Sequence, residues 1–179
     1  MAEMLDVLDG NGVRTGEIVS RKEVHEKGLW HRIALVAIVN DDNEILMQQR
    51  SMSTWKFPGL WDLSVASHVQ AGEDSISTAV RETNEEVGVQ IEYKAKVKDF
   101  RFLTSFRNHH TMEDIIENQY YDLFILRREL KLDQLSYNDN EVMDTQWVDY
   151  TMLQRLLQEN KLHPRQEWIE EVVRYINKF

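Results

Sequence analysis

Residues 67–89 read Ser-His-Val-Gln-Ala-Gly-Glu-Asp-Ser-Ile-Ser-Thr-Ala-Val-Arg-Glu-Thr-Asn-Glu-Glu-Val-Gly-Val. Asp74 or Ser75 can cap a helix by accepting a bond from a backbone N–H of its first turn, and Gly88 can end it as a left-handed cap. At 100° per residue the less polar side chains share one arc, which predicts that this side of the helix faces a core. These side chains are Ile76, Ala79, Val80, Thr83 and Val87.

Three carboxylates border that arc. Glu82 and Glu86 are one turn apart, and Glu85 lies next to Glu82 on the outward side. Like charges at this spacing destabilise a helix by roughly 0.2–0.5 kcal/mol, and partial burial increases the repulsion unless a cation compensates it. Oxygen ligands of high charge suit a hard ion such as Mg²⁺ or Mn²⁺. The alternative is a solvated acidic face with an Arg81–Glu85 ion pair.

The same run resembles the signature of the Nudix hydrolases, which cleave diphosphate bonds with a bound divalent metal. The family pattern is a glycine, five residues, Glu, seven residues, Arg-Glu, an apolar residue, any residue, Glu-Glu, any residue, Gly and an apolar residue. Two positions depart from it, with Ser67 in place of the first glycine and Thr83 in place of an apolar residue. The matching residues are Glu73, Arg81, Glu82, Glu85, Glu86, Gly88 and Val89. The resemblance implies an α/β fold, an α/β/α sandwich with a mixed sheet.

The resemblance also implies roles for the helix residues. Glu82 and Glu86 are the first expected metal ligands and Glu85 the next, while Glu82 or Glu85 could take the proton from the attacking water. Arg81 and Glu73 are expected to form an ion pair that orients the glutamates, as a hydrogen-bonded partner fixes a metal ligand.

Two further residues extend the expected site. The backbone carbonyl at the first signature position often binds metal in the family, and Ser67 keeps a carbonyl. A serine there would be strained if the turn required a positive φ. Glu141 precedes a predicted strand, where a late glutamate helps the site in some members; the alternative is an acidic loop residue.

Other segments look like isopentenyl-diphosphate isomerase, which shares the Nudix fold: Leu29–Arg32, Trp61–His68, Glu117–Gln119 and Asn140–Trp147. That enzyme holds a metal with three histidines and two glutamates, and it has a catalytic cysteine. His31 and His68 match two of the histidines, and His25 is a possible third. Glu117 matches one glutamate, but the other falls on Gln119 and the cysteine falls on Ala66.

Those two replacements separate the candidate functions. Isomerisation across an allylic system needs a proton donor and an acceptor on opposite faces of the substrate, and neither Ala66 nor Gln119 titrates. An isomerase-like Nudix hydrolase is therefore favoured over the isomerase. A non-catalytic Nudix-like binding module is a third possibility, but such a chain would usually have lost part of the Arg-Glu and Glu-Glu pairs. His31 and His68 could instead pack in the core or bind substrate.

Cationic or titratable side chains in predicted loops are candidates for binding phosphate: Arg50, Lys56, Arg107, His109 and His110. His68 is a further candidate for substrate binding, and Glu117 could lie near the metals.

Length and composition bound the remaining properties. The 179 residues suit a single domain, with residues 1–30 as an N-terminal hairpin extension and 151–179 as C-terminal helices that cover the sheet or form a homodimer contact. With no cysteine, no long apolar run and an acidic N-terminus, we expect a cytoplasmic protein without a membrane partner. The net charge of −10 argues against a nucleic-acid polymer as partner. A small diphosphate stays possible, because bound metal can invert the local charge.

Hydrophobic patterning predicts the remaining elements. They are a hairpin at 6–18, a helical turn at 22–27, strands at 32–40, 44–50, 90–98, 100–106, 118–128 and 142–148, a loop at 51–60, a polar loop or short helix at 107–117, and helices at 151–160 and 164–178. The run at 32–40 is almost entirely aliphatic, which is typical of a strand buried on both faces.

Overall fold

The structure is a computed structural model, and it describes residues 2–87, 96–112, 115–135 and 140–178. Its strands are β1 Met4–Leu8, β2 Arg14–Ser20, β3 His31–Val39, β4 Ile45–Arg50, β5 Trp61–Asp62, β6 Val65–His68, β7 Phe100–Met112, β8 Ile115–Arg127 and β9 Val142–Val148. Its α-helices are α1 Arg21–Lys27, α2 Ser75–Glu86, α3 Tyr150–Gln158 and α4 Trp168–Ile176, with short 3-10 turns η1 Val97–Asp99 and η2 Leu132–Gln134.

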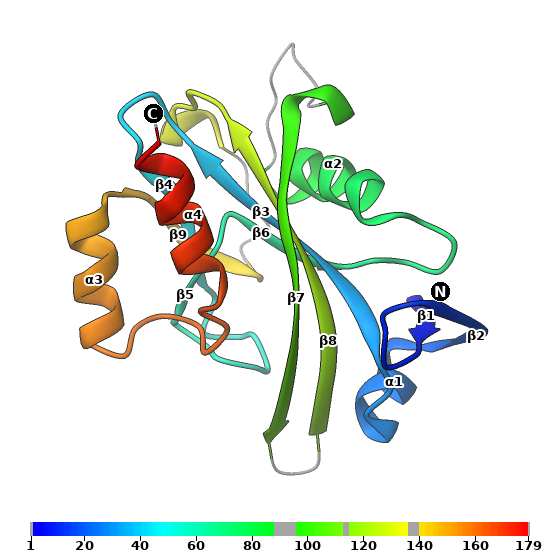
Figure 1. Cartoon of the computed structure of the whole chain (residues 1–179). Helices are drawn as coiled ribbons and strands as arrows, with labels where there is room; N and C mark the ends of the chain where they lie inside the picture. Colours follow the sequence, from blue (N-terminus) through cyan, green and yellow to red (C-terminus); the bar gives the residue numbers. More distant parts are fainter. Residues whose placement is uncertain (1, 88–95, 113–114, 136–139, 179) are drawn as a thin grey trace.

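A mixed sheet of seven strands forms the centre of the molecule (Figure 1). Its main order is β5-β4-β3-β8-β7, with β6 paired to β3 and β9 paired to β4. β3 and β8 run parallel, and the other pairs are antiparallel. Helices cover both faces of the sheet, with α2 on one side and α3 and α4 on the other (Figure 1). The predicted α/β/α sandwich with a mixed sheet and C-terminal helices is therefore confirmed.

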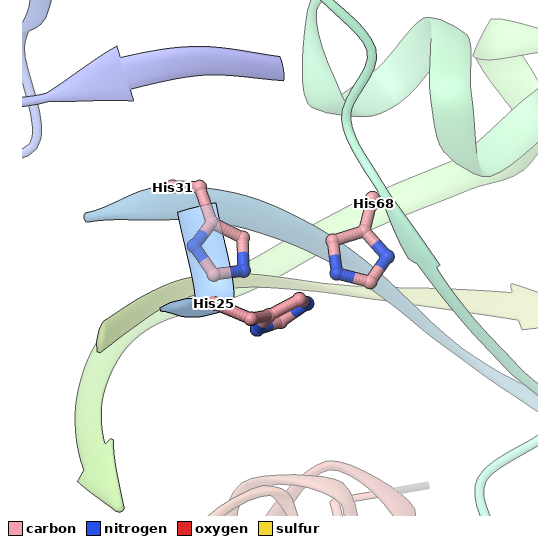
Figure 2. A group of neighbouring side chains, drawn as sticks. All are labelled: His25, His31 and His68. Atoms are coloured by element: carbon pink, nitrogen blue, oxygen red, sulfur yellow. The ribbon is translucent and has the colours of Figure 1, made fainter. Parts of the chain in front are cut away.

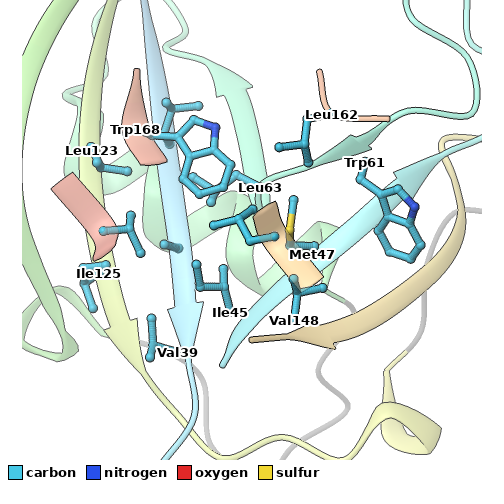
Figure 3. Close-up of a cluster of buried hydrophobic side chains, with 14 of the residues drawn as sticks. Val39, Ile45, Met47, Trp61, Leu63, Leu123, Ile125, Val148, Leu162 and Trp168 are labelled. Carbon is cyan, nitrogen blue, oxygen red and sulfur yellow. The ribbon is translucent and has the colours of Figure 1, made fainter. Parts of the chain in front are cut away.

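Strand β3 is buried on both faces, as its aliphatic sequence predicts. Ile33 and Leu35 face the core beneath α3 and α4, whereas Ala34 and Val36 face the core beneath α2. Side chains alternate between the faces of a strand, so both cores share this one strand. Figure 3 shows the larger core, in which Trp168 of α4 packs over the sheet. The C-terminal helices thus cover the sheet.

The N-terminal hairpin is formed as predicted, and it is joined to the loop that precedes α2. Leu5 pairs with Gln70, and the Ala71 amide donates to the Met4 carbonyl over 2.8 Å. The Asp6 carboxylate accepts a bond from the Gly72 amide over 2.9 Å. The described residues include no helix long and apolar enough to cross a membrane.

Two predicted segments are wrong in part. Residues 107–117 were expected to form a loop or short helix, but β7 continues to Met112 and β8 begins at Ile115. Cross-strand pairing explains the extension, because residues 107–112 pair one to one with residues 115–120 in a long antiparallel hairpin. The predicted strand at 90–98 ends differently, since residues 97–99 form η1. Residues 90–95 of that segment lie outside the described residues.

Candidate functional site

Helix α2 has the predicted start and orientation. The Asp74 side chain accepts a bond from the Ser77 amide over 2.8 Å, so Asp74 is the N-cap. Ala79 and Thr83 are buried against the sheet, and Val87 follows on the same side. Gly88, the predicted C-cap, lies outside the described residues.

Arg81 connects the start of α2 to its carboxylates. Its Nη2 lies 2.9 Å from Glu73 Oε2, and its Nη1 donates to Glu82 and lies 3.4 Å from Glu85 Oε2. The Glu73 carboxylate also accepts a hydrogen bond from the Thr78 hydroxyl over 2.7 Å, which helps to hold it against the Arg81 guanidinium. Both the Arg81–Glu73 pair and the alternative Arg81–Glu85 pair are therefore formed, and the geometry suits an arginine that orients Glu82.

Glu86 carries the strongest electrostatic signal on the helix. Burial, and then the negative charges of Glu82, Glu141 and Asp62, raise the pKa of its carboxyl to about 8, while Arg50 opposes them. Three arginines lie among these four carboxyl groups: Arg81 pairs with Glu82, Arg165 pairs with Asp62, and Arg50 opposes the charge near Glu86. One more carboxyl group than arginine is therefore present. The side chain of Glu85, in contrast, is 61% exposed. An oxygen-only set with surplus negative charge fits a hard divalent ion.

Ser67 lies in β6 opposite Ala34 of β3. Positive φ occurs five residues later, at Gly72 with a φ of 84°, and Ser67 is not among the residues with positive φ. The strain considered for a serine at this position therefore does not arise, and its carbonyl stays a candidate ligand.

A buried ion pair that the sequence reading missed lies beside these carboxylates. Arg165, in the segment between α3 and α4, places its Nη2 2.6 Å from Oδ2 of Asp62 in β5. Although burial opposes it, the charge of Arg165 lowers the pKa of Asp62 to about 2. Arg50 Nη1 is 4.0 Å from the same oxygen. The two partners are 103 positions apart in the sequence, so no local pattern reveals the pair.

Lys56 lies inside the fold rather than on an exposed loop. Its ammonium group forms an ion pair with Glu117, and both side chains are mostly buried. Although burial opposes it, the hydrogen bond and charge of Lys56 lower the pKa of Glu117. The Lys56 Nζ also lies 5.2 Å from the ring centre of Trp55, a residue that is 77% exposed. Glu117 itself lies near the histidines, with its Oε1 3.9 Å from His25 Nδ1.

Three histidines from separate elements converge, as Figure 2 shows. His25 comes from α1, His31 from β3 and His68 from β6, and one ring nitrogen of each lies within 4.8 Å of the others. Burial lowers the pKa of His25 and His31 to about 4 and that of His68 well below its ordinary value. His25 Nδ1 and His68 Nε2 are buried and have no hydrogen-bond partner among the described residues. We call these three residues the histidine cluster.

The third histidine is already engaged by protein groups. His31 Nδ1 lies 3.0 Å from the Leu29 carbonyl, which only accepts, so this nitrogen carries the proton. Its Nε2 then accepts a bond from the Gln119 amide nitrogen over 3.1 Å, and the Gln119 oxygen accepts one from Tyr121. Neutral imidazoles suit a nitrogen-preferring transition metal. In this cluster, however, the Gln119 amide is hydrogen-bonded to Nε2 of His31, and Lys56 forms an ion pair with the neighbouring Glu117.

The other predicted phosphate-binding candidates lie on the β7–β8 hairpin. His109 is exposed and its Nδ1 lies 2.6 Å from Asn118 Oδ1 across the hairpin. His110 pairs directly with Glu117, so the two share a face near the histidine cluster. Arg107 is exposed and pairs with Tyr120. All three belong to a strand, which corrects the expectation of a loop.

The residues that an isomerase would require are replaced by non-titrating groups. Ala66 packs against the core beneath α3 and α4. The Ser64 hydroxyl, a conceivable substitute for a thiol, is buried between the Ile38 amide and the Leu46 carbonyl. Gln119 is bound by His31 and Tyr121.

Comparison with known proteins places this geometry in a family. Residues 29–172 match the profile of the NUDIX domain. Nudix hydrolase 3 of Arabidopsis thaliana is 34% identical over 151 residues, which cover 83% of this chain but 19% of that protein. The chain therefore spans about a fifth of the length of that relative. An isopentenyl-diphosphate Delta-isomerase of Escherichia coli O1:K1 is 30% identical over 154 residues, covering 86% of this chain and 80% of the isomerase.

Solved structures agree in fold. DR0079 from Deinococcus radiodurans superposes with a TM-score of 0.73 at 21% identity, over 96% of this chain and 98% of that one. An Ap4A hydrolase of Caenorhabditis elegans has a TM-score of 0.56 at 17% identity, over 83% and 99% of the two chains. With the signature on α2, the mixed sheet and the match over residues 29–172, the chain belongs to the Nudix family.

Proposed function

We propose that this protein is a Mg²⁺- or Mn²⁺-dependent cytoplasmic hydrolase that cleaves the diphosphate bond of a nucleoside-diphosphate-type or related small molecule. The observation that carries the proposal is the environment of Glu86. Burial and the charges of Glu82, Glu141 and Asp62 raise the pKa of its carboxyl to about 8, although Arg50 opposes them and Arg81 and Arg165 pair with Glu82 and Asp62. A divalent cation would neutralise this surplus charge.

The residues of the site have three proposed tasks, which are metal binding, proton transfer and substrate binding. Glu82 and Glu86 would hold the cation, with Glu141, Glu85 and the Ser67 carbonyl as further oxygen ligands. Such a cation, when bound, supplies charge neutralisation for the diphosphate and lowers the pKa of a bound water.

Proton transfer and substrate binding fall to other side chains. Glu85 is exposed enough to accept a proton from water, and Glu82 is the alternative base. Arg81 orients Glu82 through its contacts to Glu73 and Glu82. Arg50 and Lys56 are the proposed phosphate-binding cations, with His68, His109 and His110 as weaker candidates.

The isomerase alternative has sequence similarity behind it but lacks the required chemistry. It needs two titrating groups on opposite faces of the substrate, and Ala66 and Gln119 provide none. A non-catalytic binding module is the other alternative, and retention of the full Arg-Glu and Glu-Glu pairs opposes it.

A release assay tests the proposal. Phosphate and pyrophosphate would be measured over a panel of nucleoside diphosphates, nucleotide sugars, dinucleotides and isopentenyl diphosphate, with Mg²⁺, Mn²⁺ or EDTA. We expect metal-dependent release from at least one compound, and none with EDTA. Tight binding of a panel member without any release would favour the binding module.

A further inference from the structure

The segment between α3 and α4 brings a guanidinium into the site from the far end of the chain. The Trp61 amide donates to the Lys161 carbonyl and the His163 amide donates to the Trp61 carbonyl, both over 2.8 Å. These two bonds attach the segment to β5. Arg165 follows two residues later and is held over Asp62, the neighbour of Trp61.

Asp62 and Arg165 form a buried ion pair, in which the Arg165 Nε has no hydrogen-bond partner among the described residues. The Asp62 side chain has no exposed surface; its Oδ1 accepts the Leu63 amide over 2.8 Å, and its Oδ2 accepts Arg165 Nη2 over 2.6 Å. The Arg165 guanidinium also lies 5.4 Å from the ring centre of Tyr121. Removing one member of such a pair leaves an uncompensated buried charge, which is strongly unfavourable.

Arg50 is a second cation within reach of the same carboxylate. Its Nη1 is 4.0 Å from Asp62 Oδ2, which is too far for a hydrogen bond. Its Nε donates to the Lys56 carbonyl over 3.0 Å, which anchors the side chain. Among the described residues its terminal nitrogens have no hydrogen-bond partner, and 26% of the side chain is exposed. Arg50 is thus held near Asp62 without a hydrogen bond to its carboxylate.

We propose that Arg165 is a positioning residue that satisfies Asp62, and thereby leaves the guanidinium of Arg50 free to bind the diphosphate of the substrate. The inference rests on the proposed function. Without Arg165, the buried Asp62 carboxylate draws Arg50 inward by about 1 Å into a direct ion pair of about 2.8 Å. The cation is then withdrawn from substrate, although no substrate contact has been mutated.

Binding of methylenediphosphonate in the presence of Mg²⁺, measured by calorimetry, tests this without requiring turnover. Arg165→Met should weaken binding about tenfold or more, as expected for loss of one contact between charged groups. The Asp62→Asn/Arg165→Met double variant should bind within about threefold of wild type, because no carboxylate remains to capture Arg50. Arg165→Lys keeps the charge and should also bind near normally.

Adding Arg50→Met to each background separates positioning from a general structural defect. The change should weaken binding about tenfold in the wild type and in the Asp62→Asn/Arg165→Met variant, and hardly at all in Arg165→Met, where Arg50 is already sequestered. An equal loss in every background overturns the proposal, as does normal binding by a folded Arg165→Met protein. If Arg165→Met does not fold, a weakly binding double variant or Arg165→Lys protein overturns it.

The matched control is Arg32→Met, which breaks another Arg–Asp pair, in which Arg32 Nη1 is 2.8 Å from Asp122. It should leave methylenediphosphonate binding unchanged, and thermal unfolding verifies that each variant is folded. A wild type that binds the probe as described but hydrolyses nothing rejects the proposed function alone. A wild type that hydrolyses diphosphates without any effect of Arg165→Met rejects only this inference.

Discussion

The carboxylate flank of α2 (Glu82, Glu85 and Glu86) and the histidine cluster are two potential metal sites with opposite electrostatics. On the flank, charge is in surplus, and the pKa of Glu86 is raised to about 8. In the cluster the imidazoles are neutral, and the nearby Glu117 is already paired with Lys56. A cation therefore relieves repulsion at the flank, whereas at the cluster it would have to compete with an ammonium group.

The two regions also differ in their place in the fold. Alternation along β3 puts His31 on the same face as Ile33 and Leu35, beneath α3 and α4. The flank belongs to α2 on the other face. The two regions are nonetheless linked, because Arg165 pairs with Asp62 and lies against the ring of Tyr121, whose hydroxyl donates to Gln119 beside His31.

The largest expected effect is an all-or-none one. Wild-type protein should convert no isopentenyl diphosphate to dimethylallyl diphosphate, even at high enzyme concentration, because Ala66 and Gln119 do not titrate and the Ser64 hydroxyl is bound by backbone groups. Product analysis by chromatography or NMR measures this. Clear conversion would mean that the histidine cluster, and not the flank, is the active centre.

Next in size is the effect of single carboxylates. Glu85→Gln or Glu86→Gln should lower turnover of the diphosphate substrate by about 10² or more, as expected on loss of a base or a metal-bound water. His25→Gln, the matched change in the histidine cluster, should lower turnover much less. Discontinuous assays of diphosphate hydrolysis measure the turnover of each variant, and thermal unfolding verifies that each variant is folded. Near-normal turnover in both glutamate variants would show that the flank is not the site.

Metal affinity should distinguish the regions through its pH dependence. Below pH 8 a cation at the flank must displace the Glu86 proton, so Mg²⁺ affinity should rise about tenfold per pH unit up to that value. The cluster is already neutral above pH 6.5, and a metal bound there would show almost no slope.

Calorimetry from pH 6 to 8 measures this slope, and Glu86→Gln should remove it. Crystals soaked in Mg²⁺ or Mn²⁺ should show the ion on Glu82 or Glu86, with Mg–O distances of about 2.0–2.2 Å. An ion bound solely by the three histidines would contradict the assignment.

The smallest effect is on stability, and it has opposite signs in the two regions. The folded-state pKa of Glu86 is raised, so its contribution to the free energy of unfolding is fully present below pH 4.5 and is lost as pH rises through 8. The folded-state pKa of His25 is lowered to about 4, so its contribution is present above pH 6.5 and is lost as pH falls.

Lowering the pH from 7.5 to 5.5 should reduce the free energy of unfolding by about 1 kcal/mol for each histidine whose pKa is lowered in this way. Urea unfolding in the presence of EDTA, repeated at several pH values, measures these contributions to the free energy of unfolding. His25→Gln should reduce the acid-side loss, and Glu86→Gln should remove the alkaline-side loss. Variants with unchanged pH profiles would refute the charge states assigned to both regions.

The sequence by itself determined the family and most of the elements. Residue spacing placed the three α2 carboxylates on one flank and predicted the doubly buried strand β3, and it offered Asp74 or Ser75 as the cap, because helix and strand periods are local properties of the sequence. The two positions at which Ala66 and Gln119 replace isomerase residues were identified by the resemblance to that enzyme.

Only the tertiary structure decided how distant charges are paired. It joined Lys56 to Glu117 and Arg165 to Asp62, and it made polar residues 107–112 part of a long strand through pairing with β8. These outcomes depend on burial and on partners as many as 103 positions away, and burial determines which charges must find a partner. Local sequence carries no record of either, which is why Arg165 was visible only in the fold.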